Sequence, residues 1–555
     1  MNVSEEFYCR MVQGRVRGPA QTDVEFRSRS VAIRLLSGSP DQAPASFSRF
    51  VLPFAYRLVE CAIPDLMRAA GERANAVTGS WDNLARWVPA LANPQCGLSR
   101  SMRATLQQRQ SYFTAETSEV LFGSRTRRFR LECPASPICC SEVWANEERA
   151  FLEPPELILF ECEVRGAEDN LLQVGLLVLS THFDASELLS STRLFKFNEC
   201  FRNFRRPFDG YDAGPPNFSA VPWLPLLLTR GCDCSDDPNT PYQQHWLRLL
   251  DAPVVGLGTG NRPYQLFDAD RSARARQFCG TLAGAPLSPM IHADHRTYVW
   301  TAAVCKGGAC ELTACADTSP VHTRGWMSLV NIDNPWDTSD QATLASKFDV
   351  QWLDDHSYLR WAPASLYGFT QHSGAAWLPA FAEPPLWNHF RSIYFDQTCL
   401  LLYLRSAIFG FSREVSSLSR QMQLDQRQGT REFSALERDF GLFTNLYQFP
   451  LLSHQQQAVE MYSKQRAALD IDDFYQEVKE EIQHMAEMFD RRHDRDIRSL
   501  GLIIAVIATL GVVWGDLGLG KLFDTRSSGV TGMVMVAALI FTAVKLFLCW
   551  IARRR

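Results

Sequence analysis

The sequence predicts an α/β body followed by a long stalk helix and a two-helix hairpin that crosses a membrane. Three observations predict this fold class. Strand-like apolar runs separated by turns occur within residues 1–385, a charged stretch without glycine or proline covers residues 470–500, and two apolar stretches follow it. Uncharged runs of roughly 20 residues are typical of membrane-spanning helices. Two buried core helices are the alternative interpretation of the paired apolar stretches.

The composition is that of an ordinary globular protein. The 555 residues are 46% hydrophobic and 21% charged, with a net charge of −5. This balance gives no reason to expect a nucleic-acid partner. The first 18 residues lack the apolar core of a secretory signal, so we expect the 16 cysteines to be reduced thiols. No nucleophile and base stand out together, so we expect no enzymatic activity.

Residues 1–385 read as a mixed α/β domain with room for two subdomains. Apolar runs at 156–164 and 171–183 flank a turn, as two strands would. We expect further strands at 296–305 and 348–353. The aromatic and polar stretch 360–374 reads as a core strand, with a pocket wall as the alternative.

Residues 386–469 read as antiparallel helices, which we expect at 387–428, 431–448 and 453–469. Pro450 separates the last two of these helices. Ser453 is a suitable N-cap for the third helix, and Gln456 follows it at the spacing of a capping box.

Residues 470–498 read as the stalk helix, with Asp470 as its N-cap. Apolar residues recur at spacings of four and three, which is the pattern of a helical seam between subunits. An amphipathic helix lying on its own domain is the alternative. The seam consists of Ile471, Tyr475, Val478, Ile482, Met485 and Phe489.

The polar side of the stalk is acidic. In a ring of parallel subunits its carboxylates would gather, and divalent cations would relieve their repulsion. We therefore regard four of them as candidate sensors of a divalent cation and expect no other cofactor. The alternative is an ordinary solvated face. The four residues are Asp473, Glu477, Glu480 and Glu487.

The predicted membrane hairpin has a first span at 499–517, an external loop at 518–527 and a second span at 528–552. A basic tail, 553–555, follows the hairpin, and four arginines between 491 and 498 precede it. Positive charge on both outer flanks places those flanks in the cytoplasm. We therefore expect a multi-pass protein of the inner membrane with the lipid bilayer as partner and both termini cytoplasmic.

One face of the first span is built from small residues at spacings of four and three. Such a stripe permits close contact between helices and would also suit a narrow pore formed by several copies. The stripe consists of Gly501, Ala505, Ala508, Val512 and Gly515.

This order of parts resembles the CorA-type divalent-cation channel superfamily over residues 387–555. The resemblance implies a funnel-shaped homopentamer whose first span lines the pore. In that family an aromatic residue precedes a Gly-Met-Asn motif, whereas here Trp514 and Gly515 are followed by Asp516 and Leu517. The implied pore and selectivity residues are Gly501, Ala505, Thr509, Trp514, Gly515 and Asp516.

The function that follows from the resemblance is a channel or transporter for cations, with Mg²⁺ or another divalent metal as the transported ion. A ring of Asp516 carboxylates would favour cations over anions. Two alternatives remain open. One is a membrane effector of bacterial defence, gated by a small molecule or nucleotide bound to the N-terminal domain, and the other is a membrane-anchored scaffold that conducts nothing.

Overall fold

The structure is a computed structural model of the 555-residue chain. It describes residues 45–56, 59–60, 86–90, 100–123, 126–132, 141–145, 148–160, 173–183, 191–202, 254, 264–265, 296–305, 320–332, 346–362, 365–379, 384–421, 426–447 and 452–516. These residues divide between two compact units, Met1–Val478 and Lys479–Arg555.

The first unit is built on one mixed sheet of 11 strands. Its main path runs in the order β11-β12-β13-β10-β1-β8-β7-β4-β3, and only β10 and β13 pair in parallel. The strands of the path are β1 (Phe47–Tyr56), β3 (Arg86–Pro89), β4 (Thr126–Glu132), β7 (Glu156–Phe160), β8 (Gln173–His182), β10 (Tyr298–Cys305), β11 (Ser357–Tyr358), β12 (Leu366–Phe369) and β13 (Ser373–Pro379). Strand β6 (Glu148–Leu152) joins β8 to β5 (Ser141–Ala145), and β2 (Val59–Glu60) pairs separately with β9 (Tyr264–Gln265).

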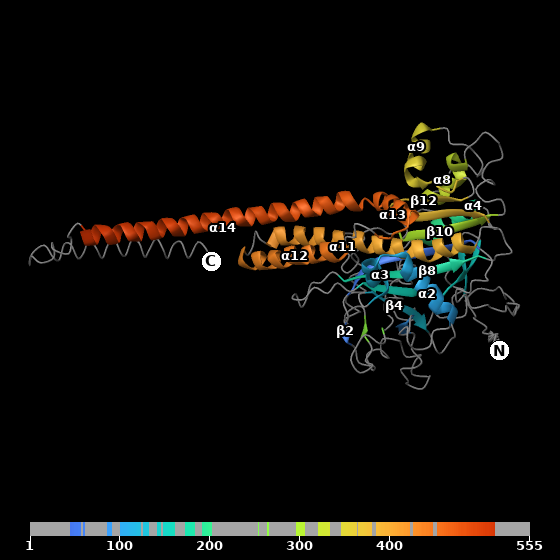
Figure 1. Ribbon diagram of the computed structural model, residues 1–555, viewed down its shortest axis with the longest axis horizontal. Helices are drawn as coiled ribbons and strands as arrows, with labels where there is room; N and C mark the ends of the chain where they lie inside the picture. Colours follow the sequence, from blue (N-terminus) through green and yellow to red (C-terminus); the bar gives the residue numbers. More distant parts are fainter. Residues whose placement is uncertain are drawn as a thin grey trace, which may run out of the picture. The chain divides into compact units, whose positions relative to one another are not determined.

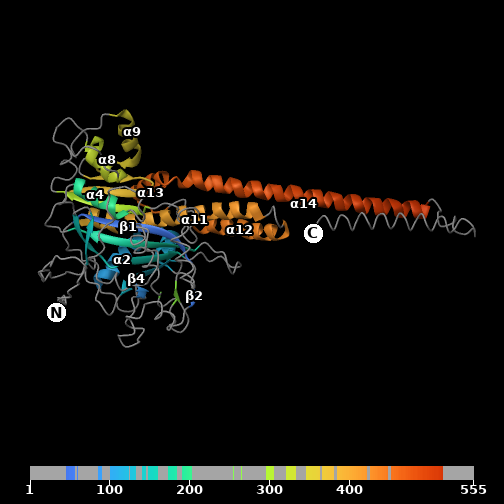
Figure 2. The ribbon, with the colours of Figure 1, turned by 180° about the vertical axis from the view of Figure 1, so that it is seen from behind.

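Helices cover both faces of this sheet (Figure 1). Successive side chains of a strand point to opposite faces, and β1 follows this rule. Phe47 contacts the rings of α10 (Pro384–Arg391), whereas Phe50 packs on α4 (Ser191–Arg202). Helix α11 (Ile393–Gln421) lies on the α10 face, and α8 (Arg324–Asn331) lies beside α4, as the view from behind also shows (Figure 2).

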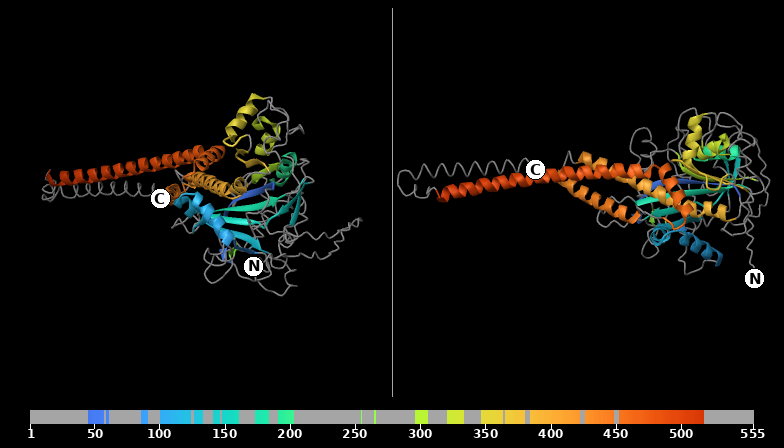
Figure 3. Two further views of the ribbon diagram at one scale, coloured as in Figure 1. Left: turned by 45° about the vertical axis from the view of Figure 1, so that its right-hand side comes forward. Right: turned by 45° about the horizontal axis from the view of Figure 1, so that its top comes forward.

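The structure describes six further α-helices. They are α2 (Arg100–Tyr112), α3 (Ala115–Phe122), α9 (Lys347–His356), α12 (Gln426–Tyr447), α13 (Gln456–Ala468) and α14 (Ile471–Asp516). Aromatic rings pack α12 against α11, with Phe411 edge-on to Phe440 at 5.3 Å. Helix α14 is a single unbroken helix of 46 residues (Figure 3).

Most of the expected elements are confirmed, and one is wrong. Strands β7, β8 and β10 lie within the stretches predicted for them, and α11 and α13 lie within the first and third predicted helices. Helix α12 covers most of the second predicted helix but begins at Gln426, five residues before the expected start at 431. Residues 348–353 form part of helix α9 instead of a strand. The side chain of Ser346 caps the start of this helix by accepting a hydrogen bond from the Phe348 backbone N–H. Leu353 is the residue of α9 whose side chain is fully buried.

The two predicted helix caps have different outcomes. Asp470 directly precedes α14, and its backbone carbonyl accepts the Phe474 N–H. Its φ of 53° lies in the left-handed region, and its carboxylate accepts a hydrogen bond from the Gln371 side-chain amide. Ser453 does not cap α13, which has Gln455 at the N-cap position. The Ser453 hydroxyl donates to the Tyr112 carbonyl instead.

The predicted membrane hairpin is contradicted. Among the residues that the structure describes, no helix is long and apolar enough to cross a membrane. The stretch from residue 499 is the end of the charged helix α14, which closes at Asp516, and does not form a separate span. This finding contradicts the predictions of a CorA-like funnel, of ion transport inferred from it and of a multi-pass inner-membrane location. The loop 518–527, the second span 528–552 and the tail 553–555 lie outside the described residues.

The first part of the predicted stalk seam packs within its own chain. Ile471, Tyr475 and Val478 are all buried. Tyr475 stacks on Phe440 of α12 with ring centroids 5.5 Å apart. This part of the seam therefore follows the alternative reading, an amphipathic helix lying on its own domain.

Candidate functional site

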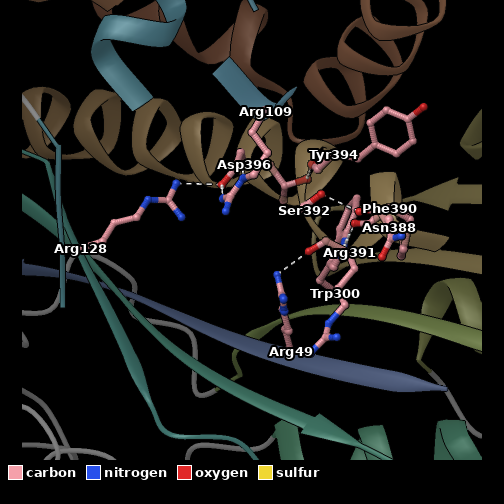
Figure 4. A network of polar contacts seen from close by, with 11 residues as sticks. Arg49, Arg109, Arg128, Trp300, Asn388, Phe390, Arg391, Ser392, Tyr394 and Asp396 are labelled. Carbon is pink, nitrogen blue, oxygen red and sulfur yellow. Dashed lines mark hydrogen bonds and ion pairs between the residues drawn. The ribbon is translucent and has the colours of Figure 1, made fainter. Parts of the chain in front are cut away.

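A network of charged side chains lies where α10 meets α11 on one face of the sheet, with Asp396 fully buried and the other members partly buried (Figure 4). We call it the junction network and define it as Arg49, Arg109, Arg128, Glu153, Arg391 and Asp396. Helix α10 ends at Arg391, and Ser392 separates it from α11. The Asn388 carbonyl of the last turn accepts both the Ser392 backbone N–H at 3.0 Å and the Ser392 hydroxyl at 2.5 Å.

Two further carbonyls at the end of α10 receive donors from the sheet. The Trp300 indole N–H donates to the Phe390 carbonyl at 2.9 Å, and Arg49 donates to the Arg391 carbonyl at 2.7 Å. Carbonyls at a helix C-terminus have no partner within the helix and carry partial negative charge. A cation from β1 and an indole from β10 therefore satisfy two carbonyls at the end of α10.

Arg49 is a cation held mainly by aromatic and carbonyl groups. Its guanidinium lies 4.3 Å from the Phe395 ring centroid and 5.8 Å from that of Phe47. Burial lowers the pKa of Arg49, and the nearby positive charge of Arg391 lowers it further. The ring faces offset part of the desolvation that burial imposes on this cation.

Asp396 lies at the centre of the network and is fully buried. Arg109 binds it through two hydrogen bonds, Nε to Oδ2 at 2.8 Å and Nη2 to Oδ1 at 2.6 Å. Arg128 donates Nη2 to Oδ1 at 2.8 Å. The carboxylate also stands in the first turn of α11, where the helix dipole favours negative charge. One carboxylate thus joins α2, β4 and α11.

Glu153 forms the second ionic centre. Arg391 donates to its Oε1 at 2.5 Å, and His182 Nδ1 lies 3.6 Å from the same oxygen. Burial alone would raise the pKa of Glu153, but Arg391, His182 and Arg49 together lower it to about 2. Glu153 therefore stays ionised at any physiological pH and ties the end of α10 to the sheet.

The junction network has a structural role. Asp396 and Glu153 are acceptors already filled by arginines, so neither is available as a general base. Burial raises the pKa of the neighbouring Cys399 thiol to about 12, which keeps this thiol protonated and poorly nucleophilic. The network holds α10 and α11 on the sheet.

The opposite face of the sheet carries a neutral counterpart. Ser48 donates to Asn198 of α4 at 2.6 Å, and the Asn198 amide donates to Thr301 at 3.1 Å. All three side chains are fully buried. Because every member has a partner, this network fixes the position of α4 without leaving a reactive group.

The predicted site residues all belong to α14 and are not brought together within one chain. Gly501 and Ala505 are exposed, and for Thr509, Trp514, Gly515 and Asp516 the structure describes the backbone alone. The four predicted sensor carboxylates, Asp473, Glu477, Glu480 and Glu487, are exposed. The described part of the chain holds no group of three or more His, Cys, Asp or Glu side chains placed to bind a metal ion. Gathering of these carboxylates between subunits stays a prediction.

The junction network was not predicted from the sequence. Its partners are far apart in the chain, since 287 positions separate Arg109 from Asp396. One signal was available. Arg49 directly precedes an apolar run and Asp396 directly follows one, and a charge in such a position needs a partner when the run is buried.

No family model matches the chain, and neither the curated proteins nor the solved structures include a match. The family resemblance expected from the sequence is therefore untested by these comparisons.

Proposed function

We propose that the chain is a non-enzymatic assembly subunit, which forms homo-oligomers through one face of the apolar end of α14. This is the scaffold alternative of the sequence analysis without its membrane anchor. The cation channel and the gated membrane effector are not proposed, because both need the predicted membrane hairpin, and no described helix is long and apolar enough to cross a membrane.

The observation that carries the proposal is an exposed apolar face at residues 501–505. Leu502 is 67% exposed and Ile504 is 58% exposed. Because an α-helix turns by about 100° per residue, Gly501 and Ala505 lie side by side between these two aliphatic side chains. A Cβ added to Gly501 would meet nothing within 4 Å. Large apolar side chains exposed together are a common mark of a protein interaction surface.

A second copy of the chain is the partner that this face suits. Small residues in its centre let two helix axes approach closely, and the aliphatic side chains at its edges can then cover the contact. The same face on both partners makes the contact self-complementary, as homo-oligomeric interfaces require. The sequence continues the small residues at Ala508 and Val512.

The test is the mass of the purified full chain by sedimentation velocity over a hundredfold range of concentration. We expect an oligomer for the wild type and a shift toward monomer for Leu502→Asp and Ile504→Asp. The matched control is Phe348→Asp, which places the same charge on a 74% exposed apolar residue of α9. A monomeric wild type, or equal masses for Leu502→Asp and Phe348→Asp, would refute the proposal.

The same experiment examines the predicted sensor carboxylates. If α14 assembles in parallel, Glu480 and Glu487 of neighbouring copies come close, and Mg²⁺ relieves their repulsion. We then expect the oligomer to weaken in EDTA and to recover with added Mg²⁺. Substitution of both residues by glutamine removes this dependence.

A further inference from the structure

Helix α13 is attached to the body of the first unit largely by polar contacts. Gln457 donates to the Tyr394 hydroxyl of α11. Glu460 accepts from the Tyr358 hydroxyl of β11 at 2.6 Å and from Arg360 at 2.9 Å. Its buried apolar side chains are few, and they are Ala458, Met461 and Tyr462.

Two of the buried polar groups beneath α13 are incompletely satisfied. Gln397 of α11 donates its amide to Gln465 Oε1 at 3.2 Å, and both residues are fully buried. Among the described residues, Gln397 Oε1 and Gln465 Nε2 have no hydrogen-bond partner. Because a buried polar atom without a partner loses its hydration and gains nothing in return, this contact opposes the docking of α13.

The segments on both sides of α13 are held to the first unit by a few hydrogen bonds. Before the helix, the Leu452 carbonyl accepts the Thr114 N–H at 2.9 Å, and Ser453 donates to the Tyr112 carbonyl. After the helix, Asp470 carries the left-handed φ of 53° and receives the Gln371 amide. A non-glycine residue in this conformation carries steric strain, which opening of the joint would relieve.

The start of α14 depends on this attachment. Residues 471–478 follow Asp470 directly, and they pack on the same unit through Phe474 against Phe409 of α11 and Tyr475 against Phe440 of α12. A displaced α13 would pull on these contacts, since no residue besides Leu469 and Asp470 separates the two helices.

We propose that α13 is a releasable strap, which controls whether the start of α14 is held against the sheet body. The strap opens as a unit at lower free energy than α11. Helix α11 is fixed by the fully paired Asp396. Helix α13 rests on an amide pair in which Gln465 Oε1 accepts from Gln397 and Thr398 of α11, whereas Gln397 Oε1 and Gln465 Nε2 have no partner among the described residues. The proposal concerns the first unit alone and is independent of the proposed assembly.

Hydrogen exchange of the native full chain, followed by mass spectrometry, tests the strap directly. We expect the amides of α13 to exchange at least tenfold faster than the buried amides of α11, with a weaker dependence on urea, as a local opening requires. Equal rates and equal urea dependence in α11 and α13 would overturn the proposal, without need of any variant.

Variants then test the cause. The pair Gln397→Leu and Gln465→Leu replaces the unsatisfied amides by side chains of similar size, and we expect α13 exchange to slow at least tenfold. Ser463→Leu is the control, because Ser463 is an exposed residue of the same helix. Gln371→Ala frees Asp470, and we expect faster exchange in residues 471–475. Unchanged or faster α13 exchange in the leucine pair would refute the assigned cause.

Discussion

Two sides of helix α11 carry buried polar residues that are satisfied to different degrees. Toward the sheet, Asp396 accepts three hydrogen bonds from two arginines. Toward α13, the next residue, Gln397, shares one hydrogen bond with Gln465, and each glutamine keeps a buried atom without a partner among the described residues. The buried polar groups therefore fix the position of α11 on the sheet, whereas those between α11 and α13 form a contact that apolar side chains could replace.

The largest expected effect breaks the satisfied side. Asp396→Ala leaves the partly buried guanidinium groups of Arg109 and Arg128 without their carboxylate. We therefore expect a loss of about 3 kcal/mol in the free energy of unfolding, at the lower end of the range for a broken buried ion pair. Urea unfolding followed by tryptophan fluorescence measures this loss. The control is Asp472→Ala, whose carboxylate is 66% exposed and pairs with Arg466. We expect about 1 kcal/mol or less there, and similar losses in both variants would contradict the comparison.

The second ionic centre predicts a dependence of stability on pH. The carboxyl of Glu153 titrates near 4.5 when unperturbed, and its pKa in the fold is about 2. A lowered pKa stabilises the fold above the unfolded pKa, and this contribution is lost as the pH falls from about 4.5 to 2. The difference corresponds to about 3 kcal/mol.

Unfolding measured between pH 6 and pH 2 checks this contribution. Glu153→Gln should flatten the decline in that window, whereas Glu437→Gln, which changes an exposed carboxylate of α12, should preserve it. A decline as steep in Glu153→Gln as in the wild type would exclude Glu153 as its source.

A smaller effect is expected from crowding the sheet beside the junction network. A Cβ at Gly374 would lie 2.3 Å from the Trp300 ring, which holds the Phe390 carbonyl. We expect Gly374→Ala to cost about 1–3 kcal/mol through displacement of this ring. Gly441→Ala in α12 meets nothing within 4 Å and should stabilise the helix by up to about 1 kcal/mol. Thermal unfolding of both variants gives the sign of each change in stability. A stabilised Gly374→Ala would show that the Trp300 ring can move freely.

Local pattern predicted much of the fold. The apolar runs that became β7, β8 and β10 and the periodic stretches that became α11 to α14 carry their signal within a dozen residues. Residues 348–353 misled because Phe348, Val350 and Trp352 alternate with polar residues, as in a strand. The N-cap at Ser346 and the burial of Leu353 favour a helix over a strand in this stretch.

The site could not be predicted in the same way. The junction network depends on the pairing of β1 with β8 and β10 and on the packing of α11 across them, and these contacts are set by the tertiary fold. The apolar stretch after residue 499 misled in another way. Its composition alone suggested a span, and it forms the end of a helix whose earlier turns are heavily charged.

The smallest expected effect compares two tyrosines that face each other across β11 and β12. Tyr358 and Tyr367 are register partners, and their ring centroids are 6.4 Å apart. The Tyr358 hydroxyl donates to Glu460 of α13, whereas the buried Tyr367 hydroxyl has no partner among the described residues.

Removal of each hydroxyl by a Tyr→Phe substitution should therefore change stability in opposite directions. Tyr358→Phe loses one hydrogen bond to a carboxylate that Arg360 and water still solvate, so we expect a cost of about 0.5–1.5 kcal/mol. Tyr367→Phe removes a hydroxyl whose burial is uncompensated, so we expect no cost or a gain of up to about 1 kcal/mol. Urea unfolding and α13 hydrogen exchange on the two variants give the comparison, and only Tyr358→Phe should also loosen α13. A loss in Tyr367→Phe as large as that in Tyr358→Phe would mean that its hydroxyl is satisfied, and that the α13 side of the body is better paired than its contacts indicate.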